Sequence, residues 1–248
     1  MSVLVIAFLG ASALLTGFVS GVFGMAGGMV LMGALLVVLP VPVAMVLHGV
    51  TLMSANGWRS MVWRRYADYW VVFRFTVGLA AAYGVFFFVS YVPDRAVVLI
   101  CLGALPFLVL AVPPRFFPQA DSRLGAELCG LINGILQFLA GVSGPVLDAF
   151  FIHSKADRRV VVATKAFCQT GAHLAKLAYF LPAGGMVDGA RLPLWVYGLS
   201  VVLAIAGTSL SRHVLEKLSD RQFQRWSKGI LLIMGAVYLI QGLYLAWR

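Results

Sequence analysis

Charged side chains are scarce in this sequence. Only 11% of its 248 residues are Asp, Glu, Lys or Arg, whereas 61% are hydrophobic, and the mean hydropathy is +0.94. A soluble globular domain carries about 25% charged residues, so lipid rather than water must surround most of this chain. The sequence therefore predicts an all-α integral membrane protein with a single transmembrane domain over residues 1–248.

Acidic residues and cysteines are also few. Nine Asp and Glu stand against nineteen Lys and Arg, which leaves a formal net charge of +10. The basic residues sit between apolar runs, where they set membrane orientation, so we expect the lipid bilayer as a partner and no nucleic acid. The three cysteines, at positions 101, 129 and 168, have no metal-like spacing. We expect neither a metal site nor a cofactor.

Six apolar runs have the length and the boundaries of spanning helices. They lie at about 41–63, 70–91, 95–112, 158–181, 191–211 and 228–247. The apolar run at the N-terminus has no charged segment before it and no convincing cleavage site, so we expect it to be retained rather than removed as a signal peptide.

Two further apolar runs are interrupted by glycines. Residues 3–39 are broken at Gly24 to Gly28, and residues 124–152 are broken at Gly141 to Pro145. The arms after the breaks would rise only roughly 10 to 17 Å as helices, which is too short to cross a bilayer. Each broken run could be a re-entrant hairpin or two squeezed crossings, and the sequence leaves both open.

The distribution of Lys and Arg predicts the orientation of these segments. Four turns are rich in basic residues, at about 59–74, 115–123, 155–159 and 212–228. Cytoplasmic loops carry the excess of positive charge, so we expect these loops inside the cell and both termini outside, in the cell inner membrane. Each broken run then begins and ends on one side.

This threading predicts two inverted repeats, each a broken helical hairpin plus three transmembrane helices. Repeat one covers 1–112, a linker 113–123, and repeat two 124–248. An offset of 117 aligns three pairs of glycines, namely Gly17, Gly24 and Gly27 with Gly134, Gly141 and Gly144. Chance is an alternative explanation, because the chain holds 26 glycines.

The two breaks predict a binding site for an anion. Non-helical backbone at membrane depth is tolerated only where protein or a water-filled cavity satisfies its polar groups. The arms would point unpaired amides and a partial positive charge at that cavity. The substrate-binding residues expected at the two tips are Gly27, Gly28, Ser143, Gly144 and Pro145. The alternative is that the glycines only allow close helix packing.

Polar residues in the helices after the breaks are further candidates, because ionisable groups at membrane depth are usually functional. Lys165, Gln169, His173 and Lys176 recur at spacings that put them on one helix face. We expect substrate binding from Lys165 first, then Gln169 and His173. The alternatives are a snorkelling Lys176 and a neutral His173 that is hydrogen-bonded to another helix.

The equivalent helix of the first half offers weaker candidates. His48, Thr51 and Asn56 are expected to bind substrate. Arg59 and Lys176 are candidates for coupling or gating. Asp148, in the second arm, could carry a coupling proton or neutralise Lys165, and pairing alone would explain it equally well.

Taken together, these residues resemble the TauE/SafE sulfite exporter family over essentially the whole length. The resemblance rests on Gly17-x-x-x-Gly21-x-x-Gly24-x-x-Gly27-Gly28, on its second copy at Gly141 to Gly144, and on the segment from Arg158 to Ala166. It implies transport of sulfite, sulfoacetate or a related sulfur-containing anion. Pro145 departs from the family pattern, which often has glycine there.

The functional hypothesis is a secondary transporter, not an enzyme, that moves a small sulfur-containing anion by alternating access of the two halves. A homodimer is compatible with this hypothesis. A passive anion channel is the nearer alternative. A more distant one is a rhomboid-like intramembrane protease, which would use Ser143 as nucleophile and His173 as base within hydrogen-bond reach of each other.

Overall fold

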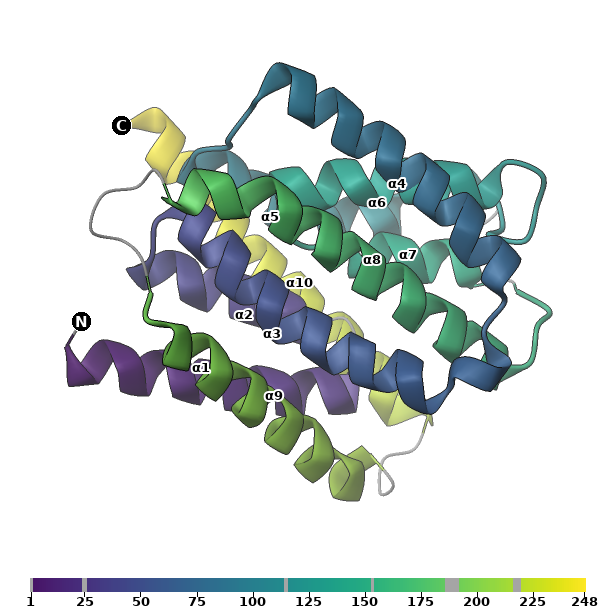
Figure 1. Cartoon of the computed structure of the whole chain (residues 1–248), viewed down its shortest axis with the longest axis horizontal. Coiled ribbons are helices and arrows are strands. Elements are labelled where there is room, and N and C mark those ends of the chain that lie inside the picture. The colour runs from purple at the N-terminus through teal and green to yellow at the C-terminus, as the bar shows by residue number, and fades with distance from the viewer. Residues whose placement is uncertain (1, 24–25, 114–115, 153, 186–191, 216–219) are drawn as a thin grey trace.

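The computed structural model describes residues 2–23, 26–113, 116–152, 154–185, 192–215 and 220–248. Within these ranges the chain is helical and contains no strand (Figure 1). The helices are α1 (Val3–Phe23), α2 (Ala26–Val38), α3 (Val41–Val62), the 3₁₀ helix η1 (Arg64–Tyr66), α4 (Tyr69–Val89), α5 (Arg95–Ala111), α6 (Gly125–Leu139), α7 (Gly144–Phe151), α8 (Arg158–Gly185), α9 (Leu194–Leu215) and α10 (Asp220–Trp247).

Two of the helices begin at an aspartate that the sequence places after a turn. The side chain of Asp68 accepts hydrogen bonds from the backbone N–H groups of Trp70 and Val71, and that of Asp94 accepts one from Val97. These contacts satisfy amides that have no partner inside the helix. The starts of α4 and α5 therefore agree with the prediction to within one residue.

The six predicted spanning runs become α3, α4, α5, α8, α9 and α10. Five of them match to within four residues at each end. Helix α10 is the exception, because it begins at Asp220 and not at residue 228. The prediction followed apolar residues only, and the helix extends into the polar segment before them.

Four helices in the described part of the chain are long and apolar enough to cross a membrane. The stretches are Val3–Ser20, Tyr69–Val89, Leu194–Ser211 and Lys228–Trp247. Helices α3 and α8 have the length, with 22 and 28 residues, but they are less apolar. They pack along each other in the interior. Several of their polar side chains are buried there against protein, namely His48, Thr51, Gln169, His173 and Lys176.

Both glycine breaks separate two helices, but the first is shorter than predicted. Gly24 and Met25 lie outside the described residues, and α2 already begins at Ala26, so Gly27 and Gly28 belong to its first turn. In the second break, α6 ends at Leu139 and Gly141 has a φ of +72°. That left-handed conformation strains any residue with a Cβ and explains the glycine.

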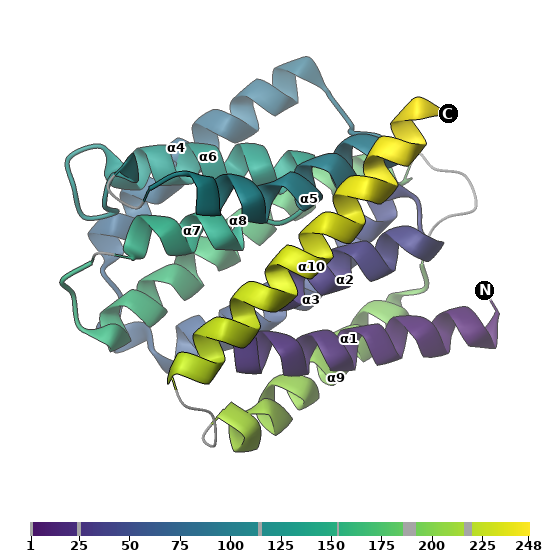
Figure 2. The same ribbon diagram turned by 180° about the vertical axis from the view of Figure 1, so that it is seen from behind.

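The helices pack as four long pairs within one bundle. Helix α1 lies along α9 at one edge of Figure 1, α4 lies along α6 at the opposite edge, and α3 lies along α8 between them. Figure 2 shows the fourth pair, α5 and α10, on the reverse side, where α10 also contacts α2. The short helices α2 and α7 are largely buried among these pairs.

Glycines allow the closest of these contacts. A Cβ on Gly78 of α4 would overlap the carbonyl oxygen of Glu127 in α6, and a Cβ on Gly130 of α6 would overlap that of Phe75 in α4. The α1–α9 pair uses the same device, since a Cβ on Gly17 would overlap the backbone of α9. These glycines bring helix backbones into direct contact, as small residues do in membrane proteins.

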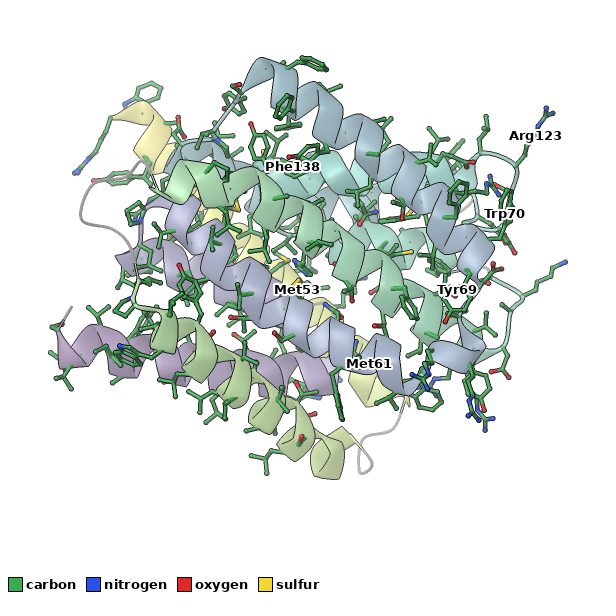
Figure 3. All side chains as sticks on the ribbon, in the orientation of Figure 1. Met53, Met61, Tyr69, Trp70, Arg123 and Phe138 are labelled. Atoms are coloured by element: carbon green, nitrogen blue, oxygen red, sulfur yellow. The ribbon has the colours of Figure 1, made fainter. Side chains whose placement is uncertain are left out.

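The two ends of the bundle differ. The first residue of α1 and the last of α10 lie at the same end, and the turn from α3 to α4 lies at the other (Figures 1 and 2). At that second end Met61, Tyr69 and Trp70 are exposed on the outside of the bundle (Figure 3). Exposed aromatic residues at a helix end are typical of a membrane–water interface.

Candidate functional site

One pocket lies where both broken segments meet the α3–α8 pair. Its cavity volume is about 20 Å³. It is lined by Ser20, Gly28, His48, Leu52, Asn56, Arg59, Val142, Ser143, Gly144, Gln169 and His173. The lining therefore combines residues from the two ranges 1–112 and 124–248, although the two sets are more than eighty residues apart in sequence.

The helical repeat places several of these side chains. His48, Leu52, Asn56 and Arg59 of α3 follow one another at spacings of four, four and three, so they share one face of that helix. Gln169 and His173 occupy successive turns of α8. The two helices run antiparallel, since Gly57 neighbours Thr170 whereas Gly49 neighbours Leu177. Their polar faces thus meet along the pocket.

Both short helices begin at the pocket wall. Gly28 lies in the first turn of α2, and Gly144 is the first residue of α7. A Cβ on Gly28 would lie 3.0 Å from the Leu52 side chain, so a larger residue would crowd the wall. The first amides of a helix lack partners inside it and carry a partial positive charge, which favours a negative occupant.

A chain of hydrogen bonds joins the second break to α8. Ser143 Oγ donates to Gln137 Oε1 over 3.1 Å, and Gln137 Nε2 donates to His173 Nδ1 over 2.7 Å. His173 therefore bonds to another helix, as one of the two sequence interpretations expected. The Ser143 hydroxyl is directed at Gln137 and not at His173, so the direct serine–histidine contact that a protease needs is not formed.

A second chain of hydrogen bonds joins the two broken segments through α3 and α8. His48 Nε2 donates to the carbonyl of Gly28 over 2.9 Å, so its Nδ1 accepts from Lys176 Nζ over 2.7 Å. Lys176 Nζ also donates to the carbonyl of Gly141 over 2.9 Å. Lys176 is completely buried, so the interpretation that it snorkels to the interface is wrong. It ties α2 to the second break.

Two polar groups in the pocket wall have no hydrogen-bond partner. The amide nitrogen of Gln169 is buried without one. Within the described part of the chain, the Arg59 guanidinium makes no hydrogen bond and no ion pair at contact distance, although the Asp148 carboxylate is close enough to act on it electrostatically. Buried polar groups are normally bonded, so the Gln169 amide is available to a bound molecule. The Arg59 guanidinium, which is half-buried, is available as well.

Several residues predicted at the site lie outside the pocket. Lys165 forms an ion pair with Asp148, and neither lines the pocket. Thr51 donates to the Leu47 carbonyl and to Ser200 on α9, so it contributes to helix packing.

Two of the predicted tip residues are also used for packing. Gly27 abuts Ser20 and Thr16 of α1, so its missing side chain allows α2 to approach α1. Pro145 is buried in the first turn of α7, beside the pocket-lining Gly144. Its position suits a residue that has no N–H group to offer.

Sequence reasoning missed Ser20 and Gln137. Ser20 lines the pocket from α1, and Gln137 holds Ser143 and His173 in place. One signal was present, because Gln137 is a polar residue within a largely apolar helix four positions before Gly141. Gln137 also lies 117 residues after Ser20, which is the same offset that aligns the three pairs of glycines.

Comparison with known proteins agrees with this architecture. Searches of curated proteins and of solved structures found no match. The family model described as sulfite exporter TauE/SafE matches residues 9–238, which is nearly the whole chain. A match of that extent, on a chain with four long apolar helices, shows that this multi-pass membrane protein belongs to the TauE/SafE sulfite exporter family of transporters.

Proposed function

We propose that this chain is a secondary transporter for a small sulfur-containing anion, sulfite or an organosulfonate such as sulfoacetate, and that the anion binds in the pocket between α3 and α8. The observation that carries the proposal is that two donors without partners, the Arg59 guanidinium and the Gln169 amide, face a pocket where two helices begin. A tetrahedral or pyramidal oxyanion can accept from all of these groups.

Each group has a distinct role in the proposed site. Arg59 supplies the positive charge and a planar fork of donors that suits two oxygens of one anion. Gln169 and Asn56 supply neutral hydrogen bonds. The first amides of α2 and the N–H of Gly144 at the start of α7 add donors that need no side chain. Lys165 is reassigned from binding the anion to pairing with Asp148, which keeps a carboxylate near the pocket from repelling the anion.

Two features support an inverted repeat with halves 1–112 and 124–248 joined by the linker 113–123. First, exchanging the halves maps the contacts onto each other. The α1–α9 pair corresponds to α6–α4, while the α3–α8 and α5–α10 pairs each map onto themselves. Second, pocket residues lie at matching positions, since Leu52 and Asn56 precede Gln169 and His173 by 117 residues.

The proposed mechanism is alternating access around this pocket. Beyond the Lys176–His48 bond, Phe138 packs against Tyr179 and Phe86 with ring centroids 5.2 and 5.0 Å apart, and this aromatic cluster closes one side. Arg59 lies toward the other side. We propose that the protein lies in the cell inner membrane and that the open side faces the cytoplasm, because the basic loops lie beyond Arg59. Both termini then lie outside.

The test is transport by purified protein in liposomes. Uptake of labelled sulfite, thiosulfate, sulfoacetate and acetate is measured with and without an imposed pH difference. A transporter gives saturable uptake that favours the sulfur anions over acetate. Uptake that rises linearly with concentration would instead indicate the passive channel. No uptake of any sulfur anion, by protein that is folded and correctly inserted, would refute the proposal.

A further inference from the structure

A second and larger hollow adjoins the pocket. It is a groove of about 520 Å³ between the later halves of α3 and α9. Trp58 and Val62 of α3 form one wall, and Ile205 and Thr208 of α9 form the other. Arg59 belongs to the lining of both the groove and the pocket. One guanidinium therefore stands between the two spaces.

The groove walls suit an apolar body and not a second charged group. The hydroxyls of Thr208 and Ser209 already donate to the carbonyls of Ala204 and Ile205 in their own helix. The remaining wall consists mainly of hydrocarbon and of the two indole rings of Trp58 and Trp63. Pockets for organic ligands have this composition, a largely apolar lining with a few placed polar groups, and volumes of several hundred Å³.

The pocket itself leaves an extended ligand little alternative to the groove. On the side away from Arg59, Lys176 bonds to His48 and Gly141, and Phe138 packs behind that contact. When Gln169 and the starts of α2 and α7 hold the anionic head, any group attached to that head therefore has room only on the side of Arg59. The groove lies in that direction along α3.

We propose that the transported anion carries an apolar organic body, and that this body occupies the groove between α3 and α9 while the acidic head occupies the pocket. The inference rests on the proposed function and narrows its substrate class to organic anions with several carbon atoms. Charge complementarity at Arg59 fixes which end of the ligand enters the pocket, since only the head is negative.

The proposal predicts a dependence on chain length. Burying one methylene group improves affinity about threefold to fourfold. Methanesulfonate, propanesulfonate and pentanesulfonate share one head and differ only in the length of the tail. Their ability to inhibit sulfite uptake in liposomes should therefore rise along the series by about tenfold or more at each step of two carbons.

Variants that fill the groove provide the matched comparison. Ala55→Trp fills it from α3, and Ile205→Trp fills it from α9 should the first variant fail to fold. In the wild type, pentanesulfonate should inhibit at a far lower concentration than methanesulfonate. In either variant the two inhibitory concentrations should differ by no more than about twofold. Val202→Trp adds the same side chain at an exposed position of α9 outside the groove, and it should keep the wild-type ratio.

The outcomes separate this inference from the proposed function. Sulfite uptake that all three sulfonates inhibit equally would overturn the groove assignment and leave the transporter intact. A chain-length trend that persists in Ala55→Trp and Ile205→Trp would also overturn it, because the tails would then sit elsewhere or partition into lipid. Absence of uptake of every sulfur anion, sulfoacetate and the three sulfonates included, would refute the proposed function. Calorimetric binding of the three sulfonates to detergent-purified protein would then test the groove assignment separately.

Discussion

Replacing Arg59 by methionine tests the proposed site most directly. Arg59 is partly buried and lines the pocket, and within the described residues its guanidinium has no hydrogen-bond partner. A hydrogen bond to a charged group contributes about 1.5–3 kcal/mol, and about 1.4 kcal/mol corresponds to a tenfold change in affinity. Arg59→Met should therefore weaken sulfite binding about 10- to 100-fold. Arg59→Lys keeps the charge but loses the fork of donors, so it should weaken binding less.

The assay is calorimetric titration of detergent-purified protein with sulfite, alongside initial uptake rates in liposomes, because a change in KM alone does not report binding. The melting temperature of Arg59→Met should stay close to that of the wild type, since Arg59 makes no hydrogen bond to any described residue. Arg64→Gln is the control, as Arg64 lies in exposed η1 a few residues further on. It should leave affinity within about twofold and change only the salt dependence of uptake. Equal sulfite affinity in Arg59→Met and wild type would refute the site.

Three further substitutions have definite expected outcomes. Gln169→Leu removes a buried amide whose nitrogen lacks a partner. It should therefore raise the melting temperature and lower sulfite affinity about fivefold. A lower melting temperature would contradict the absence of a partner for this amide. Gly78→Ala places a Cβ against the Glu127 carbonyl and should cost about 1–3 kcal/mol in thermal unfolding, whereas Gly84→Ala, in open space, should be neutral or stabilising. Ser143→Ala should reduce sulfite affinity by less than about tenfold. A peptidase activity of the wild type that Ser143→Ala abolishes in folded protein would instead favour the rhomboid-like protease.

Much of the helical framework could be predicted because it follows from local properties of the chain. Apolar length and charged turns located α3, α4, α5, α8 and α9 to within a few residues. Glycine and proline located the second break, where Gly141 adopts a left-handed conformation. The start of α10 was missed because its first turns are polar, and hydropathy does not detect a helix that leaves the lipid.

For the binding site, the sequence could predict only which face of α8 carries the polar residues and not which of those residues line the pocket. The spacing of Lys165, Gln169, His173 and Lys176 correctly put them on one side of α8, but that side is longer than the pocket. Only Gln169 and His173 reach it. Lys165 is instead held by Asp148, and the spacing within one helix cannot report what a different helix brings to each turn.

The roles of Arg59 and Gln137 depend on contacts between distant parts of the chain. The sequence predicts Arg59 as a candidate for coupling or gating, but it gives no reason to expect the Arg59 guanidinium in the binding pocket itself. Its position on the pocket face of α3 becomes decisive only when α8 lies alongside. Gln137 matters because the break at Gly141 turns Ser143 back toward α6.

The backbone contacts at Gly17 and Gly78 have a consequence for movement. Each clamps an early helix to a late one, α1 to α9 and α4 to α6, so closely that the members of a pair must travel together. Any rigid lobe that moves during a transport cycle therefore contains helices from both halves of the polypeptide. Cutting the chain between residues 112 and 124 would leave two fragments, and each would hold only one helix of each close pair. Neither fragment would form a lobe alone, so the two would have to associate in order to fold.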